Sequence, residues 1–215
     1  MKQPADLRAA AGTLGCDLDQ MQAERMLEYL ALLQKWNRVH NLTAVRDTDD
    51  MFVLHLLDSL AVTAWMETAL LLDVGSGGGL PGIPLAIARP AMQVELIDSN
   101  LKKISFLRQA VIELGLRNVT VRSGRVEQLD GRGRYPGIIA RAFAETGDLV
   151  RLTRARLAPH GRWYVMKGAY PEAELRELPP GVVVELVHAL DIPGLRAERH
   201  LLILKDDHEQ DICDH

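Results

Sequence analysis

The amino-terminal part of the chain carries apolar residues at the spacing of amphipathic helices. Between residues 19 and 36 they recur at steps of three and four, and Asp19 stands where the N-cap of a helix would lie. A polar stretch at 46–50 separates this pattern from a second one at 51–65. We therefore expect residues 1–66 to form a helical extension whose helices pack on each other and on the rest of the protein.

From residue 70 onward the pattern changes to short apolar runs separated by helical segments, which is typical of βαβ units. The apolar runs predict strands at 70–74, 94–97, 119–121, 137–140, 162–166, 182–188 and 201–205. The segments between them predict helices at 82–88, 101–114, 147–157 and 171–178. Too few residues join the last two runs for a crossover helix, so we expect those two strands to be antiparallel.

These elements predict a doubly wound α/β core over residues 67–205. Its sheet would have seven strands, mostly parallel, with one antiparallel strand. Residues 206–215 are polar, and we expect them to form a disordered tail.

Composition and charge narrow the class of protein. With 47% hydrophobic and 25% charged residues the chain resembles ordinary globular proteins. Its net charge of −4 argues against coating nucleic acid by bulk electrostatics. No apolar stretch reaches the length that crosses a bilayer, and the first residues lack a secretory signal, so we expect a cytoplasmic protein without a membrane partner. We also expect a monomer. Cys16 and Cys213 lie far apart, which predicts free thiols and no metal site.

Glycines are concentrated directly after the first predicted strand. Five of them occupy residues 75–82, and glycines such as Gly75 and Gly77 let the backbone turn tightly and approach a ligand. The amides of the helix that follows favour a carboxylate or phosphate. Asp98 ends the second strand, where a carboxylate can accept hydrogen bonds from ribose hydroxyls. Turn and acid together predict a nucleotide-like ligand.

The glycine pattern alone leaves the class of ligand open. Gly77 to Gly82 fits the G-x-G-x-x-G fingerprint, and Asp98 follows about twenty residues later, as in dinucleotide-binding folds. An NAD(P)-dependent oxidoreductase and a non-catalytic nucleotide-binding module are therefore alternatives. Asp73, before the first glycine, and the antiparallel last strand together resemble class I S-adenosylmethionine-dependent methyltransferases, which have a Rossmann-like fold.

Blocks on both sides of the turn extend this resemblance. They are similar, in the same order, to the blocks of the RsmG (GidB) family of small-subunit ribosomal RNA guanine-N7 methyltransferases. The similar blocks are residues 36–47, 55–60, 73–84, 96–99, 106–108, 124–127, 140–144, 166–168 and 198–201. The resemblance implies methyl transfer from S-adenosyl-L-methionine to N7 of a specific guanine in 16S rRNA, in the small ribosomal subunit or an assembly intermediate. The chain departs from the family at Leu54, Lys103 and Ala140, where the family commonly has arginine, arginine and serine.

The resemblance also implies which residues contact the cofactor. In the turn they are Gly75 and Leu80. After the third strand, Val126 and Glu127 would meet the adenine edge through backbone and acceptor groups. Arg141, after the fourth strand, would hold a carboxylate or a phosphate, although arginines at such positions also form structural ion pairs.

The implied chemistry requires no general base, because guanine N7 carries a lone pair and no proton. Orientation and electrostatics would provide the catalysis, so no catalytic residue is assigned. The chain lacks a cysteine in its core, and it lacks the Asp/Asn-Pro-Pro-Tyr-like turn of exocyclic-amine enzymes at residues 140–143. Arg141 and Phe143 are candidates for placing the substrate: Phe143 would stack on the target base or pack in the core.

Several polar residues are weaker candidates for contacts with the substrate. His40, Asn41 and His55 would line the mouth of the site or serve only as hydrogen-bonded structural residues. A rim of basic side chains would contact RNA phosphates. Its candidates are Lys35, Arg38, Arg46, Lys102, Lys103, Arg122, Arg125, Arg132 and Arg134.

Overall fold

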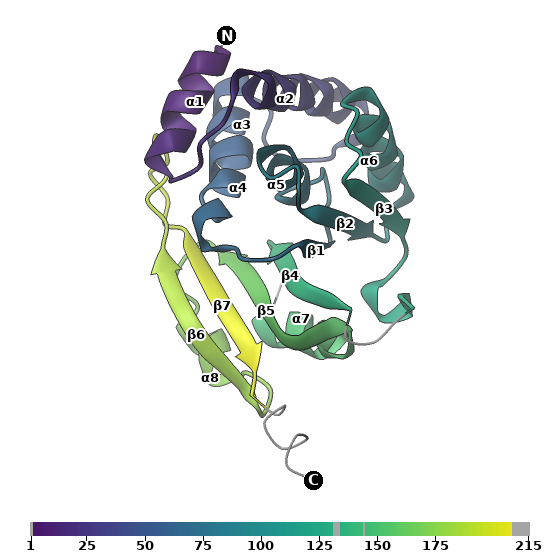
Figure 1. The fold of residues 1–215 in the computed structure, drawn as a ribbon, viewed down its shortest axis with the longest axis vertical. Coiled ribbons are helices and arrows are strands. Elements are labelled where there is room, and N and C mark those ends of the chain that lie inside the picture. Colours follow the sequence, from purple (N-terminus) through teal and green to yellow (C-terminus); the bar gives the residue numbers. More distant parts are fainter. Residues whose placement is uncertain (1, 131–133, 144, 208–215) are drawn as a thin grey trace.

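A seven-stranded sheet forms the centre of the computed structural model, which describes residues 2–130, 134–143 and 145–207. Its strands, in the spatial order β3-β2-β1-β4-β5-β7-β6, are drawn in Figure 1. They are β1 (Leu70–Val74), β2 (Gln93–Asp98), β3 (Val119–Ser123), β4 (Tyr135–Arg141), β5 (Leu157–Lys167), β6 (Val182–Ala189) and β7 (His200–Asp206). Only β7 is antiparallel to its neighbours, β5 and β6. The predicted sheet with one antiparallel strand is therefore confirmed.

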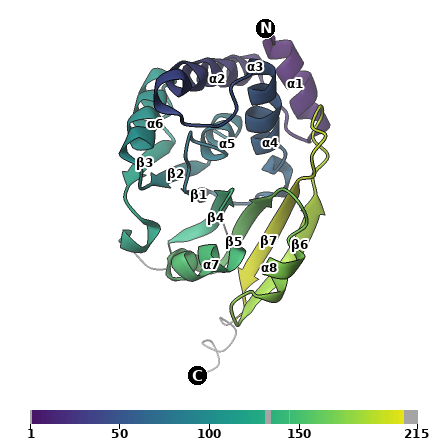
Figure 2. The same ribbon diagram turned by 180° about the vertical axis from the view of Figure 1, so that it is seen from behind.

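Helices cover both faces of this sheet, as Figures 1 and 2 show. One face carries α1 (Pro4–Thr13), α2 (Gln20–His40), α3 (Thr48–Met51), α4 (Asp58–Leu60), α5 (Gly82–Ala88) and α6 (Leu101–Glu113). The other face carries α7 (Thr146–Thr153) and α8 (Glu172–Arg176). Because successive residues of a strand point to opposite faces, Leu71 joins the larger core on the first face and Leu72 the smaller core on the second.

The long helix of the amino-terminal segment begins where its sequence predicts. Asp19 accepts a hydrogen bond from the Gln22 amide at 2.7 Å, and the Gln22 side chain accepts one from the Asp19 amide at 2.9 Å. This capping box satisfies amides that the first turn of a helix leaves unpaired. The helix continues four residues beyond the predicted end and stops at Asn41, which has a left-handed backbone (φ 50°).

The second amino-terminal helix differs in form from the regular helix predicted at 51–65. After α3 the chain forms a π-helical segment, Phe52–Leu57, then α4 and a 3₁₀ turn at Thr63–Trp65. Apolar periodicity cannot distinguish these helix types, because all of them place one side against the core. Such π-helical turns are rare and often occur at functional sites.

The region around β5 also departs from the prediction. The helix predicted at 147–157 ends at Thr153, and β5 begins at Leu157, five residues before the predicted strand. The early part of β5 pairs with β4 across a register shift at Tyr135/Gly137, which local sequence does not reveal.

The last strand reaches almost to the end of the described chain, which is Asp207. β7 extends to Asp206, whose two carboxylate oxygens accept bonds from Nε and Nη2 of Arg154, both at 2.6 Å. The first residue of the predicted tail is thus part of the sheet. Residues 208–215 lie outside the described residues.

Candidate functional site

The glycine turn follows β1 at the edge where the parallel strands end. Gly75 and Gly77 have positive φ values of 70° and 58°, a region that residues with a Cβ rarely adopt. The turn is held from the amino-terminal segment, since the Tyr29 hydroxyl of α2 donates to the Gly78 carbonyl at 2.5 Å. The turn is therefore shaped by its own glycines and braced by the helical extension.

Asp98 links this turn to the end of β2. One of its carboxylate oxygens accepts from the Gly77 amide at 3.0 Å, and the other accepts from the Asn100 amide at 2.8 Å. Lys103 Nζ lies 3.7 Å from the same carboxylate. Because each oxygen has a second lone pair, Asp98 can hold the turn through the Gly77 amide and still accept hydrogen bonds from the hydroxyl groups of a ligand.

A pocket of about 390 Å³ opens beside these residues, and we call it the cofactor pocket. It brings together Gly75, Asp98, Val126 and Glu127, four of the residues predicted to contact the cofactor. Phe143, considered for stacking on the target base, lines this pocket too. The volume is within the range of small-molecule sites.

The other predicted cofactor residues occupy different positions. Leu80 is buried in the larger core and does not line the cofactor pocket. Gly77 does not line it either, but its amide positions Asp98. Arg141 lines a second pocket. The structure therefore separates ligand-facing candidates from residues that support them.

Asp73 lies completely buried beneath the turn. Its Oδ2 accepts from the Gly82 amide at 2.9 Å, whereas Oδ1 has no hydrogen-bond partner among the described residues. Burial disfavours the charged form and raises the pKa of this carboxyl to about 7, although the Gly82 amide and the Arg141 charge act in the opposite direction. Asp73 is thus poised to change charge near neutral pH.

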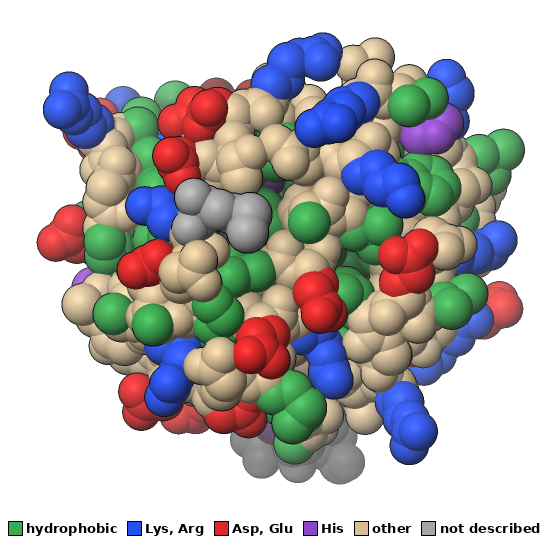
Figure 3. Space-filling model, turned by 90° about the horizontal axis from the view of Figure 1, so that it is seen from above, with side chains coloured by type: hydrophobic (Ala, Val, Ile, Leu, Met, Phe, Trp, Pro, Cys, Tyr) green, Lys and Arg blue, Asp and Glu red, His purple; other side chains and the backbone are tan. Residues whose placement is uncertain are grey.

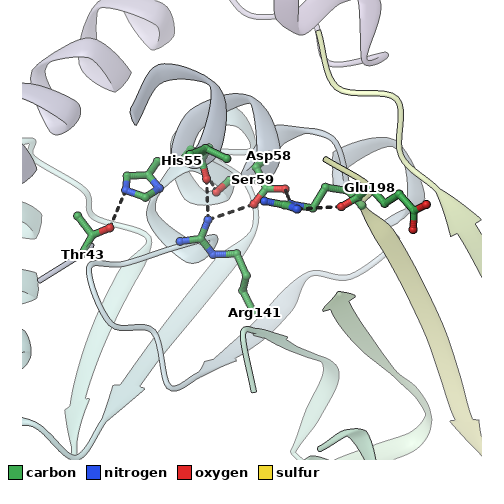
Figure 4. A network of polar contacts seen from close by, with 8 residues as sticks. Thr43, His55, Asp58, Ser59, Arg141 and Glu198 are labelled. Carbon is green, nitrogen blue, oxygen red and sulfur yellow. Dashed lines mark hydrogen bonds and ion pairs between the residues drawn. The ribbon is translucent and has the colours of Figure 1, made fainter. Parts of the chain in front are cut away.

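Arg141 belongs to an ion-pair network with the amino-terminal segment (Figure 4). Its Nη1 donates to the Leu54 carbonyl at 2.9 Å and to Asp58 Oδ2 at 3.1 Å. Arg199 Nε donates to the other oxygen of Asp58, also at 3.1 Å. Asp58 is buried between two guanidinium groups, and this arrangement favours the structural ion pair considered as the alternative role of Arg141.

The second pocket, of about 420 Å³, lies next to this network. Its lining comprises Val45, Leu54, His55, Asp58, Arg141, Ala142, Met166, Lys167, Gly168 and Arg199. Three consecutive residues connect the two pockets along the chain. Arg141 and Ala142 line the second pocket, and Phe143 lines the cofactor pocket. Ala142 has a φ of +55°, a strained backbone for alanine that is frequent near active sites.

His55 is part of the wall of the second pocket, but His40 and Asn41 are not. The His55 Nε2 atom lies 3.0 Å from the Thr43 hydroxyl, and burial together with Arg141 lowers the pKa of the ring to about 4. The ring of His40 packs at a tilt against Trp36, and Asn41 accepts a hydrogen bond from Arg46. The three polar residues therefore have separate environments, and a neutral His55 alone faces the pocket.

The predicted basic rim is only partly available for RNA. Arg122 and Arg134 both form ion pairs with Glu95, and Lys103 and Arg125 line the cofactor pocket. Arg132 lies outside the described residues. The remaining candidates are exposed: Lys35 and Arg38 on α2, Arg46 in the connection after it, and Lys102 on α6. Figure 3 shows basic side chains scattered among acidic and apolar ones on the face it presents.

The described part of the chain holds neither a metal-binding group of three or more His, Cys, Asp or Glu residues nor a helix long and apolar enough to span a membrane.

Sequence reasoning gave no role to Asp58 and Arg199, the other members of the ion-pair network. They are 141 residues apart, and no local periodicity connects such positions. The available signal was a single carboxylate within the apolar pattern at 51–65, because a buried charge requires a partner.

Comparison with known proteins identifies the family of the chain. The family model described as GidB, rRNA small subunit methyltransferase G, matches residues 22–202. A protein of Neisseria gonorrhoeae (strain NCCP11945) named ribosomal RNA small subunit methyltransferase G is 51% identical over 205 residues, which cover 95% of this chain and 99% of that protein. A protein of the same name from Nitrosospira multiformis is 47% identical over 212 residues, covering 95% and 98%.

Solved structures support the fold at much lower identity. A glycopeptide N-methyltransferase, MtfA, complexed with S-adenosyl-L-methionine has a TM-score of 0.60 at 12% identity and covers 70% of this chain and 93% of its own. A S-adenosylmethionine-dependent methyltransferase of Aquifex aeolicus has a TM-score of 0.56 at 16% identity, covering 80% and 97%. The class I methyltransferase fold expected from the sequence is confirmed. Because the family model and the close relatives each span most of the chain, this protein belongs to the GidB family, the rRNA small subunit methyltransferases G.

Proposed function

We propose that this protein transfers a methyl group from S-adenosyl-L-methionine to N7 of one guanine in 16S rRNA, within the small ribosomal subunit or an assembly intermediate. We further propose that it acts as a cytoplasmic monomer. The observation that carries the proposal is the cofactor pocket, in which the glycine turn, Asp98 and the Val126-Glu127 segment meet in a chain of a methyltransferase family. Family membership favours methyl transfer over the oxidoreductase and over a non-catalytic module.

The residues that follow or end strands β1 to β4 fit this cofactor. Asp98 has lone pairs left for ribose hydroxyls, and Val126 with Glu127 would contact the adenine edge. Among the described residues, Oδ1 of Asp73 and Nε and Nη2 of Arg141 have no hydrogen-bond partner, and their position near the turn suits a zwitterionic amino-acid group. Leu80 would support the turn from the core and Gly77 through its bond to Asp98.

The bound cofactor would supply an electrophilic methyl group on a sulfonium centre. The attacking N7 of guanine has no proton, so the chain needs to orient the base and tolerate positive charge. His55, with its lowered pKa, stays neutral near the site and adds no positive charge there. The buried carboxylate of Asp58 offsets one of the two guanidinium charges beside it. Catalysis by position and electrostatics is consistent with this set of residues.

Nucleoside mass spectrometry of small-subunit rRNA tests the function. A strain without this protein is expected to lack one 7-methylguanosine that reappears when the gene is returned. Calorimetry with purified protein should show binding of S-adenosylhomocysteine and none of NAD⁺. If every 7-methylguanosine persisted in the deletion strain, the proposed reaction would be wrong.

A further inference from the structure

We propose that the second pocket, between the ends of β4 and β5 and the amino-terminal segment, receives the target guanine base. The inference rests on the proposed function and adds the place where the substrate binds. Its first support is location, because the carboxyl ends of β4 and β5 form one edge of the sheet, and ligands of such sheets bind beyond that edge. Arg141 and Ala142 face this pocket while the next described residue, Phe143, faces the cofactor pocket.

The left-handed backbone of Ala142 explains how one short stretch serves both pockets. A positive φ at this residue turns the chain sharply between Arg141 and Phe143. A base in the second pocket and a nucleoside in the cofactor pocket would therefore lie beside the same short turn, where they can meet directly. Methyl transfer requires such a meeting of two ligands, since reacting atoms must come within about 3.5 Å.

The lining of the second pocket suits a flat base with a polar edge. Val45, Leu54 and Met166 provide apolar surface for a ring, as in sites that hold unstacked bases. Asp58 and Arg199 provide hydrogen-bonding groups for its polar edge, whereas the remaining donors of Arg141 are left for the cofactor. The volume of about 420 Å³ is within the range of pockets for small ligands.

The arginine chemistry favours guanine over adenine. Arg199 donates through Nε to Asp58 and through Nη1 to the Glu198 carbonyl, and its Nη2 has no hydrogen-bond partner among the described residues. An N–H donor of this kind can bond to the O6 acceptor of guanine, whereas adenine presents an amino group at that position. A contact to O6 from Nη2 alone leaves the N7 lone pair available for attack on the methyl group.

Gly168 offers a direct test, because it is an exposed residue in the wall of this pocket. A Cβ at position 168 would meet only Arg199 Nη1, at 3.9 Å, so a larger side chain fits the backbone and extends over the pocket. Gly168→Leu should fill the base site and leave the cofactor pocket intact. The matched control is Ala169→Leu, which adds the same side chain at the next exposed position, outside the pocket lining.

We expect the rate of 7-methylguanosine formation on unmethylated small subunits to fall about 100-fold in Gly168→Leu, the usual loss when reacting groups are misplaced. Gly168→Ala should give an intermediate loss, and Ala169→Leu should match the wild type. The Kd of S-adenosylhomocysteine should stay within about twofold in all variants, which also reports that they are folded. Binding of the subunit itself should change little, because the loss is expected in kcat.

Three other results would each contradict one of the two proposals, the base site or the function. If Gly168→Leu methylates as fast as Ala169→Leu, the base does not bind in the second pocket, while the proposed function stands on the wild-type activity. If Gly168→Leu loses S-adenosylhomocysteine binding together with methylation, the two pockets are not separate sites and the assignment is overturned. If the wild-type protein forms no 7-methylguanosine on these subunits, the proposed function fails first.

Discussion

At the scale of single residues, Asp73 is a buried carboxyl group whose charge a bound ligand should change. It is fully buried, its pKa is raised to about 7 chiefly by desolvation, and one of its oxygens lacks a partner among the described residues. The cationic amino group of S-adenosylhomocysteine near the turn would favour the ionised form and lower this pKa. Binding should therefore release a proton, and the affinity should rise about tenfold between roughly pH 6 and 8. Calorimetry in buffers of different ionisation enthalpy measures both quantities.

Asp73→Asn provides the control for this titration. The amide oxygen of asparagine can still accept the bond from Gly82, so the turn should keep its shape while the titrating group is removed. Proton release should disappear and the affinity should become nearly independent of pH over this range. An unchanged pH profile in the variant would assign the titration to another group.

The sequence predicts the site residues that lie in short local motifs, but not those brought together by contacts between distant segments. Gly75, Asp98, Val126 and Glu127 lie in short motifs beside predicted strands, and these four line the cofactor pocket. Leu80 lies in the same glycine-rich segment but is buried in the core. Its direction could not be predicted, because a motif specifies a position along the chain and not which way the side chain points. The Asp58–Arg199 pair depends on contacts between the amino-terminal segment and β7, which no local pattern encodes.

At the scale of elements, helix α2 has a capped amino terminus, and its side chains support the glycine turn and the end of α5. The Gln22 side chain, part of the capping box with Asp19, also donates to the carbonyls of Ile87 and Ala88 at the end of α5. Farther along α2, Tyr29 braces the glycine turn. Asp19→Ala should lower the free energy of unfolding by about 1 kcal/mol, because the first-turn amide of Gln22 loses its acceptor. Urea denaturation followed by circular dichroism measures this change.

Asp17→Ala is the matched control for the cap. Asp17 is exposed in the segment just before α2, and its side chain does not cap that helix. Its substitution by alanine removes the same charge as Asp19→Ala. Its substitution should change the free energy of unfolding by less than about 0.5 kcal/mol. Equal losses in the two variants would attribute the effect to charge and not to the capping box.

The elements themselves were predictable to the extent that one face of each is buried. Helix α2 and the central strands carry the periodicity of 3.6 or the apolar run that burial requires, so their positions follow from the sequence. The start of β5 does not, since Leu157–Gly161 become strand only by pairing with β4 across a bulge. The π-helical segment Phe52–Leu57 likewise arises from packing, and it leads into Asp58 of the ion-pair network.

At the scale of the whole molecule, charge limits how RNA is bound. The net charge is −4, and Arg122, Arg134, Arg141 and Arg199 are engaged in ion pairs with carboxylates of the same chain. Among the rim candidates in the described chain, five side chains are exposed without an ion pair to a carboxylate: Lys35, Arg38, Arg46, Lys102 and Arg125. Such a surface holds few phosphates, so the shape of a folded particle must contribute much of the recognition.

This balance predicts a strong preference for an assembled substrate. The kcat/KM for methylation of small subunits should exceed that for protein-free 16S rRNA by at least about tenfold, because single weak phosphate contacts cannot replace a complementary surface. The affinity for the particle should fall with salt at a log–log slope of about −4 or less in magnitude, since each phosphate neutralised by one of the five exposed side chains contributes about 0.7 to 0.9. Lys35→Glu with Arg38→Glu should weaken particle binding and leave the Kd of S-adenosylhomocysteine unchanged, because both residues lie on α2 outside the cofactor pocket. Equal methylation of naked RNA, or a slope several times steeper, would show instead that a basic surface dominates recognition.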